Sequence, residues 1–173
     1  GHFVCALLDK GERSQGIDVS AGMIKYGNKQ ISLLHGHNPL IKTSESGIIK
    51  QVNSTKLSII SAIGVIEHLR YPQQFFKAFQ NSNAQYLYAC VPMFSLSVYV
   101  ENIFKKVYPR HLSGGHTHIF SNESLEWMYQ HYQLEPIAEW RFGSDVTDLF
   151  RSASVFLQDN NSSQKFSETF KKF

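Results

Sequence analysis

Residues 57–72 read LSIISAIGVIEHLRYP, and this stretch decides the fold class of the chain. Its first part, residues 57–63, is β-branched and apolar on both faces, which is typical of a central parallel strand covered by helices. Pro72 then suits the first turn of a helix, because a proline there loses no hydrogen bond. The helix that follows carries one apolar stripe at helical spacing, formed by Phe75, Phe76 and Phe79.

Strand-like and helix-like segments alternate on both sides of this stretch. Upstream, residues 4–8 are helical and residues 16–19 form a short strand, and the Ser20 hydroxyl suits the N-cap of a second helix. Downstream, residues 86–91 read as another buried strand, which Pro92 stops. Strand and helix in alternation are the pattern of a parallel α/β sheet, so we expect this fold class.

The clearest helix begins at Ser121, which caps it. Its apolar positions recur at i, i+3, i+4 and i+7, on Leu125, Met128, Tyr129 and Tyr132. We therefore expect this helix to bury one face in a core.

Four further segments complete the assignment. Residues 27–55 are read as short strands and loops, and residues 94–107 as an amphipathic segment. Residues 136–142 and 153–157 look like two late strands, which would give the sheet an antiparallel end.

Length and composition describe one globular domain. At 173 residues, with 42% hydrophobic and 18% charged residues, the chain is long enough for a single core and too apolar for disorder. Residues 1–157 are assigned to this domain, and residues 158–173 to a polar tail with a short helix. No apolar run reaches the roughly 20 residues that cross a bilayer, which argues against a membrane-spanning protein.

The net charge and the cysteine content limit the kinds of partner and the cellular compartment that we expect. The net charge of +3 is mild, and Lys and Arg are scattered, which argues against nucleic acid as a partner. Cys5 and Cys90 stand in apolar surroundings, where a free thiol usually behaves as a small buried hydrophobe. So few cysteines fit a reducing compartment, and we expect a cytoplasmic protein.

Two strand ends carry polar residues suited to chemistry. Asp18 lies between a strand and a helix, where a carboxylate either accepts hydrogen bonds from ribose hydroxyls or caps the helix. Gly64 permits close backbone approach to a ligand. Glu67 and His68 bring titratable groups to the same strand end, where a structural role is the simpler interpretation.

The histidines form the other candidate group: His35, His37, His111, His116 and His118. A zinc site needs three or four ligands, and no carboxylate or cysteine stands at a diagnostic spacing, so no metal site is predicted. His116 and His118 are read as pocket-lining groups that act as acid, base or substrate-orienting residues, since imidazole titrates near neutral pH.

Four segments, in this order, resemble the class I S-adenosylmethionine-dependent methyltransferases, in particular the small-molecule subgroup related to the ubiquinone-biosynthesis methyltransferases. A G-x-D-x-S-x-x-M segment stands at residues 16–23, and a V-x-E-H-L-x-x-P segment at residues 65–72. A strand ends in V-P at residues 91–92, and an H-x-x-x-F-S-x-x-S-L segment stands at residues 116–125. The resemblance covers roughly residues 1–157.

This resemblance implies a Rossmann-like, seven-stranded sheet, mostly parallel with a reversed last strand and with helices on both faces. It implies S-adenosylmethionine as the cofactor. Asp18 would bind the ribose hydroxyls, and Val19 and Met23 would pack near the adenine.

The resemblance also implies roles for the later motifs. Ala62, Ile63 and Gly64 would lie along the adenosine and methionine portion of the cofactor. His116 and His118 would face a small-molecule methyl acceptor. Methyl transfer requires alignment of the methyl group with the acceptor, and a base where the acceptor loses a proton.

The chain departs from the family pattern in two places. Ser58 stands where the family often has an aspartate. The family's first strand and most of its G-x-G-x-G loop would precede this sequence, and Gly1 is either the last glycine of the loop or a remnant of cloning. We therefore expect a chain cut in this way to bind the cofactor weakly or not at all, and its exposed sheet edge to favour self-association.

Two other classes of protein stay open. A nicotinamide-dependent reductase or epimerase would also use Asp18 on a ribose, but neither Tyr86 nor Tyr99 has the Lys four residues on that such enzymes need. A non-catalytic interaction domain would present Trp127, Trp140 and Phe142 to a partner, although aromatic residues are usually in the core.

Overall fold

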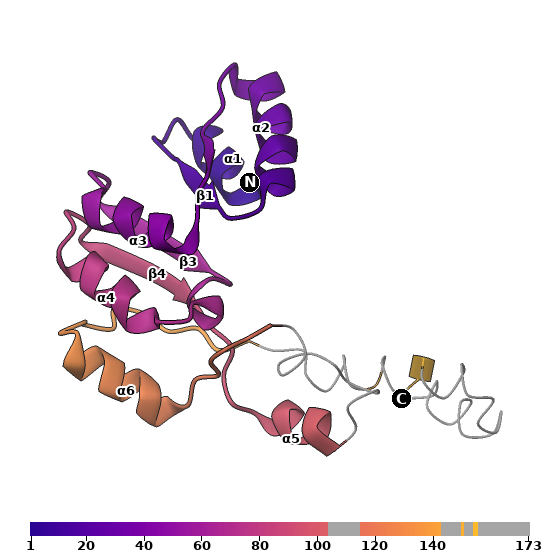
Figure 1. Cartoon of the computed structure of the whole chain (residues 1–173), viewed down its shortest axis with the longest axis vertical. Helices are drawn as coiled ribbons and strands as arrows, with labels where there is room; N and C mark the ends of the chain where they lie inside the picture. The colour runs from indigo at the N-terminus through magenta and orange to yellow at the C-terminus, as the bar shows by residue number, and fades with distance from the viewer. Residues whose placement is uncertain (104–114, 143–149, 151–153, 156–173) are drawn as a thin grey trace. The chain divides into compact units, whose positions relative to one another are not determined.

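A computed structural model gives the fold and describes residues 1–103, 115–142, 150 and 154–155 (Figure 1). Helices and strands alternate through the first half of the chain. In order, they are α1 (His2–Leu8), β1 (Gly16–Asp18), α2 (Ala21–His35), β2 (Leu40–Lys42), α3 (Glu45–Ser54), β3 (Ile59–Ile63), the 3-10 turn η1 (Ile66–His68), α4 (Pro72–Gln80), β4 (Tyr86–Cys90), α5 (Leu96–Ile103) and α6 (Asn122–His131).

The described strands form two small parallel sheets, so the chain is a mixed α/β protein as expected. In the first sheet β1 pairs with β2, with Asp18 opposite Lys42. In the second, β3 lies beside β4. The Ser58 carbonyl accepts from Gln85 N at 2.8 Å. At the other end of the same pair, Gly64 N donates to the Cys90 carbonyl at 3.4 Å, so the two strands run in the same direction.

The chain divides into two compact units. The first holds residues 1–60 and 73–87. The second holds residues 61–72 and the described residues from Tyr88 onward. Among the described residues, no helix combines the length and the apolar character that crossing a lipid bilayer requires.

The core of the first unit is built where α1, α2 and β2 meet. Val4, Ile31 and Leu40 are buried together there. The Asn28 side chain holds β2 beside α2, because its Nδ2 donates to the Leu40 carbonyl at 2.8 Å and its Oδ1 accepts from Leu40 N at 2.9 Å. The Ser20 hydroxyl caps α2, as predicted, by accepting from Met23 N at 3.3 Å.

Residues 27–55 are more helical than the sequence suggested. Instead of short strands and loops, α2 runs on to His35, and α3 occupies most of the remainder, with only β2 extended. The Ser44 hydroxyl begins α3 by accepting from Gly47 N at 3.1 Å. Ile48 and Val52, four residues apart, are the buried face of α3.

The two best-defined helices of the sequence are confirmed. Phe75, Phe76 and Phe79 are the buried stripe of α4. Ser121 caps α6 in a reciprocal capping box with Ser124, since each side chain accepts from the other residue's backbone nitrogen. Three of the four apolar positions predicted for α6 are buried: Leu125, Met128 and Tyr132.

The expectation that β3 and β4 are covered on both faces is wrong within the described residues. Ile59 is 59% exposed and Tyr88 is 55% exposed. Side chains alternate between the faces of a strand, and Ala62 is the buried member of β3. A strand with apolar residues on both faces is therefore not always covered by other elements on both faces.

The predicted strand at residues 136–142 is not formed either. These residues have no regular structure, and Trp140 is 84% exposed. Ser154 and Val155, in the second predicted late strand, are helical. A strand needs a neighbour to satisfy its backbone, and none of the described strands pairs with residues 136–142. The end of the amphipathic segment beyond Ile103 and the tail at 158–173 lie outside the described residues.

Candidate functional site

The loop after β1 presents the carboxylate of Asp18 to solvent. Asp18 Oδ1 accepts from Ser20 N at 2.7 Å, which shapes the turn into α2. Among the described residues, the second carboxylate oxygen has no hydrogen-bond partner. Asp18 therefore supports the helix start with one oxygen and keeps the other available for a ligand.

Apolar side chains flank this carboxylate without being buried. Val19 and Met23 are both more than half exposed. Gly1, the other residue assigned to the cofactor in this unit, is exposed, and one side of it faces Leu40. A Cβ on Gly1 would stand 3.1 Å from Leu40 Cδ1, so close packing against Leu40 accounts for a small residue there.

The turn after β3 brings the second set of predicted residues together. Ala62 is buried, Ile63 is half exposed, and Gly64 has a φ of 63°. This left-handed conformation is strained for residues with a Cβ, which explains a glycine at the strand end.

Glu67, for which the sequence favoured a structural role, is a buried carboxylate. It is only 5% exposed, and its Oε2 has no hydrogen-bond partner among the described residues. A buried carboxylate oxygen without a partner is costly unless a proton, a cation or a ligand compensates it. The adjacent pair Glu67 and His68 was visible in the sequence, but burial, which is the informative property, was not.

His68 and His116 join Glu67 in one cluster. The His68 and His116 ring centroids are 4.7 Å apart. One ligand atom from each of Glu67, His68 and His116 lies within 4.8 Å of the others, an arrangement that could hold a divalent cation. The sequence predicted no metal site because His116 is far from the pair along the chain.

Thr117 and His118 fasten this cluster to the turn after β3. The Glu67 carbonyl accepts from Thr117 N at 2.8 Å and from His118 N at 3.2 Å. The Thr117 hydroxyl lies 3.0 Å from the Leu69 carbonyl oxygen and 2.8 Å from His118 Nδ1. The predicted pair His116 and His118 thus lies with Glu67 and His68, while His111 is outside the described residues.

Comparisons with known proteins assign this chain to no family: no family model, no curated protein and no solved structure matches it.

Proposed function

We propose that this chain carries the cofactor-binding fold of an S-adenosylmethionine-dependent methyltransferase whose acceptor is a small molecule. One observation carries the proposal: the exposed carboxylate of Asp18 stands at the carboxyl end of a parallel strand, directly before a helix. Ligands of open α/β sheets bind at this end of the strands, and an acidic residue there accepts hydrogen bonds from ribose hydroxyls.

In the first unit, the free oxygen of Asp18 binds the ribose. Val19 and Met23 supply exposed apolar surface beside it. Covering that surface with a flat adenine ring removes it from water, which is favourable.

In the second unit, Ala62, Ile63 and Gly64 serve the adenosine and methionine portion. The left-handed Gly64 has no side chain to hold off a ligand. His116 and His118 serve the acceptor, where Glu67 and His68 lie with them. An imidazole of this cluster accepts the proton of an acceptor that must ionise, and a cation held by Glu67 would orient an acceptor oxygen.

The Rossmann-like sheet and a cytoplasmic, reducing location belong to the same proposal. Cys5 and Cys90 are both free thiols, which is compatible with a reducing compartment.

An interaction domain is the second candidate, and one observation favours it. Trp127, Trp140 and Phe142 are all exposed, whereas aromatic residues of this size usually lie in the core. Trp127 stacks on His131 with ring centroids 4.4 Å apart, so one face of its exposed indole is covered.

Thermal unfolding in the presence of nucleotides separates these functions. Because the sequence predicts weak cofactor binding at most, we expect a small rise in the unfolding temperature, and only at millimolar S-adenosylhomocysteine; a ligand that binds only the folded state stabilises it. Asp18→Ala removes the effect, and Glu12→Ala, which removes another exposed carboxylate, retains it. A rise with nicotinamide dinucleotides alone would favour the reductase class. No rise with any nucleotide would contradict the proposal.

A further inference from the structure

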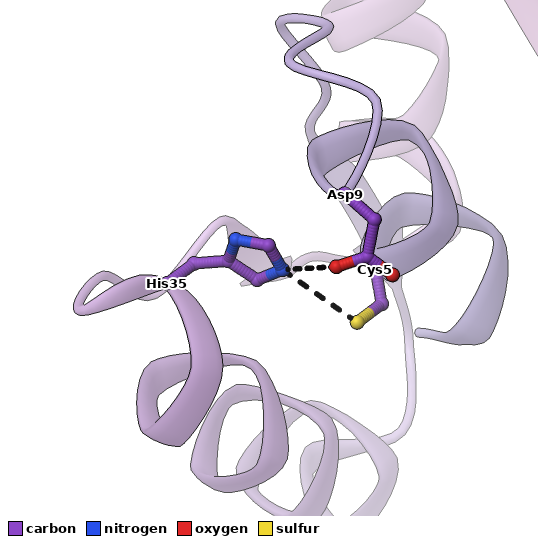
Figure 2. Close-up of side chains that lie close together, drawn as sticks. All are labelled: Cys5, Asp9 and His35. Atoms are coloured by element: carbon purple, nitrogen blue, oxygen red, sulfur yellow. Dashed lines mark hydrogen bonds and ion pairs between the residues drawn. The ribbon is translucent and has the colours of Figure 1, made fainter.

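Three side chains with metal-binding atoms lie together in the first unit: Cys5, Asp9 and His35 (Figure 2). Cys5 belongs to α1, Asp9 follows its last turn, and His35 is the last residue of α2. Cys5 and Asp9 share one face because they are four residues apart on a helical path. Cys5 and His35 are 30 residues apart, and the packing of the two helices brings them together.

Two of the three distances within this cluster are close to those of ligands around one ion. His35 Nε2 lies 3.0 Å from Asp9 Oδ1 and 3.8 Å from Cys5 Sγ, and all three ligand atoms lie within 4.8 Å of one another (Figure 2). Tetrahedral zinc, with its usual bond lengths, separates nitrogen from oxygen by about 3.3 Å and nitrogen from sulfur by about 3.6 Å. The observed separations differ from these values by a few tenths of an ångström.

A hydrogen bond at His35 Nε2 engages only one of its two neighbours in this cluster at a time. The single nitrogen Nε2 of His35 faces both a carboxylate oxygen and a sulfur. In the neutral ring this nitrogen carries either one hydrogen or one lone pair, so it cannot donate fully to both neighbours. A cation would engage all three atoms at once, because each would donate an electron pair to the same ion.

The surrounding structure holds two of the ligands and leaves a path for an ion. Cys5 packs against the buried core of Val4, Ile31 and Leu40. The His35 side chain is largely buried, and Asp9 is exposed. The cluster therefore lies at the edge of the buried core and opens to solvent on the side of its carboxylate.

We propose that Cys5, Asp9 and His35 bind a divalent cation of the zinc class, with the fourth position open to water. A thiolate, an imidazole and a carboxylate suit zinc and cobalt, whereas magnesium and calcium prefer oxygen ligands alone. The ion joins the C-terminal ends of α1 and α2. The site does not depend on the proposed methyl transfer.

Cobalt titration of the full chain tests this site, because a thiolate bound to Co²⁺ gives a charge-transfer absorption in the near ultraviolet. We expect this absorption in the reduced, metal-free protein and expect Zn²⁺ to abolish it. Cys5→Ser removes the absorption, and Cys90→Ser, the matched thiol control, retains it. Asp9→Asn and His35→Gln weaken Co²⁺ binding by at least about tenfold. The cluster of Glu67, His68 and His116 has no sulfur and cannot produce this signal.

A second measurement distinguishes the loss of metal binding from the failure of a variant to fold. Saturating Zn²⁺ raises the unfolding temperature of the wild-type chain by roughly 5 °C or more, and His35→Gln, which keeps the thiol and its core contacts, loses this rise. Three results would overturn the site: no charge-transfer absorption at millimolar cobalt, absorption that survives Cys5→Ser, or absorption that Cys90→Ser removes. If circular dichroism shows that the metal-free Cys5→Ser variant is unfolded, the result with His35→Gln decides whether the site binds the metal.

Discussion

His68 Nδ1 lies 3.2 Å from the backbone carbonyl oxygen of Gly115, a residue 47 positions further along the chain. A carbonyl only accepts hydrogen bonds, so Nδ1 carries the hydrogen. In the neutral ring Nε2 then holds the lone pair, which is the form that binds a cation or accepts a proton. One backbone contact thus ties the segment before His116 to the turn after β3 and sets the chemistry of His68.

The buried carboxylate of Glu67 gives a prediction about stability with and without a cation. In chelator, we expect Glu67→Gln to be at least as stable as the wild type, because the amide buries no charge and Oε2 has no hydrogen-bond partner among the described residues to lose. Millimolar Mn²⁺ stabilises the wild type and leaves the variant unchanged. Urea unfolding under both conditions measures the difference. A loss of more than about 1 kcal/mol by the variant in chelator would mean that the carboxylate is already compensated internally.

The capping box of α6 gives a prediction about helix stability. The Ser121 hydroxyl accepts from Ser124 N at 3.2 Å, and Ser121→Ala leaves that nitrogen without its acceptor. We expect the free energy of unfolding to fall by about 1 kcal/mol. Gln130→Ala, on the exposed side of the same helix, should change it by less than about 0.5 kcal/mol. Equal effects of the two substitutions would argue against a capping role.

The same serine controls the ionisation of Glu123. A hydrogen bond with the Ser121 side chain lowers the pKa of this carboxyl, with a further contribution from a backbone hydrogen bond. Ser121→Ala should therefore raise the pKa of Glu123, which a carboxyl-carbon NMR titration measures. Because the folded pKa lies below the unfolded one, the stabilisation from Glu123 is present above the unfolded pKa and is lost as the pH falls through the folded one. An unchanged pKa in the variant would disprove the link.

The phenol of Tyr132 gives a prediction about the free energy of unfolding at alkaline pH. Burial raises the pKa of its phenol above the ordinary value. The unfolded chain then ionises first, near pH 10, so stability is complete below that pH and falls as the pH rises through the folded pKa. Tyr132→Phe removes this contribution, and its unfolding free energy should decline less steeply above pH 10. Parallel slopes for the two proteins, measured by urea unfolding, would contradict the assignment.

Local signals in the sequence were sufficient where a helix carried its own start signal, a first-turn proline or a capping serine, and its own apolar stripe. That is the case for α4, with three phenylalanines, and for α6, with Ser121. The start of α3 at Ser44 was missed because only Ile48 and Val52 mark its buried face. Whether β3 is covered by other elements, and whether residues 136–142 pair with a strand, depends on which segments lie beside them. Hydrophobic periodicity does not reveal these neighbours.

The candidate sites also differ in whether residues close together in the sequence, or residues far apart, form them. Asp18 and Gly64 could be picked out because each stands at a strand end in a local pattern. Cys5 and His35 are 30 residues apart on different helices, and no spacing rule links them. The sequence favoured a structural role for Glu67, because a sequence does not show which side chains are buried. Only the structure shows that its Oε2 is buried and has no hydrogen-bond partner among the described residues.

The central claim is that the strand end at Asp18 serves an adenosine-containing cofactor. Backbone amide NMR spectra of the full chain, titrated with S-adenosylhomocysteine to millimolar concentration, test it most directly because they detect weak binding residue by residue. We predict saturable shifts at Val19 and Met23 that are absent in Asp18→Ala. Unperturbed spectra at these residues, or shifts that persist in Asp18→Ala, would contradict the claim.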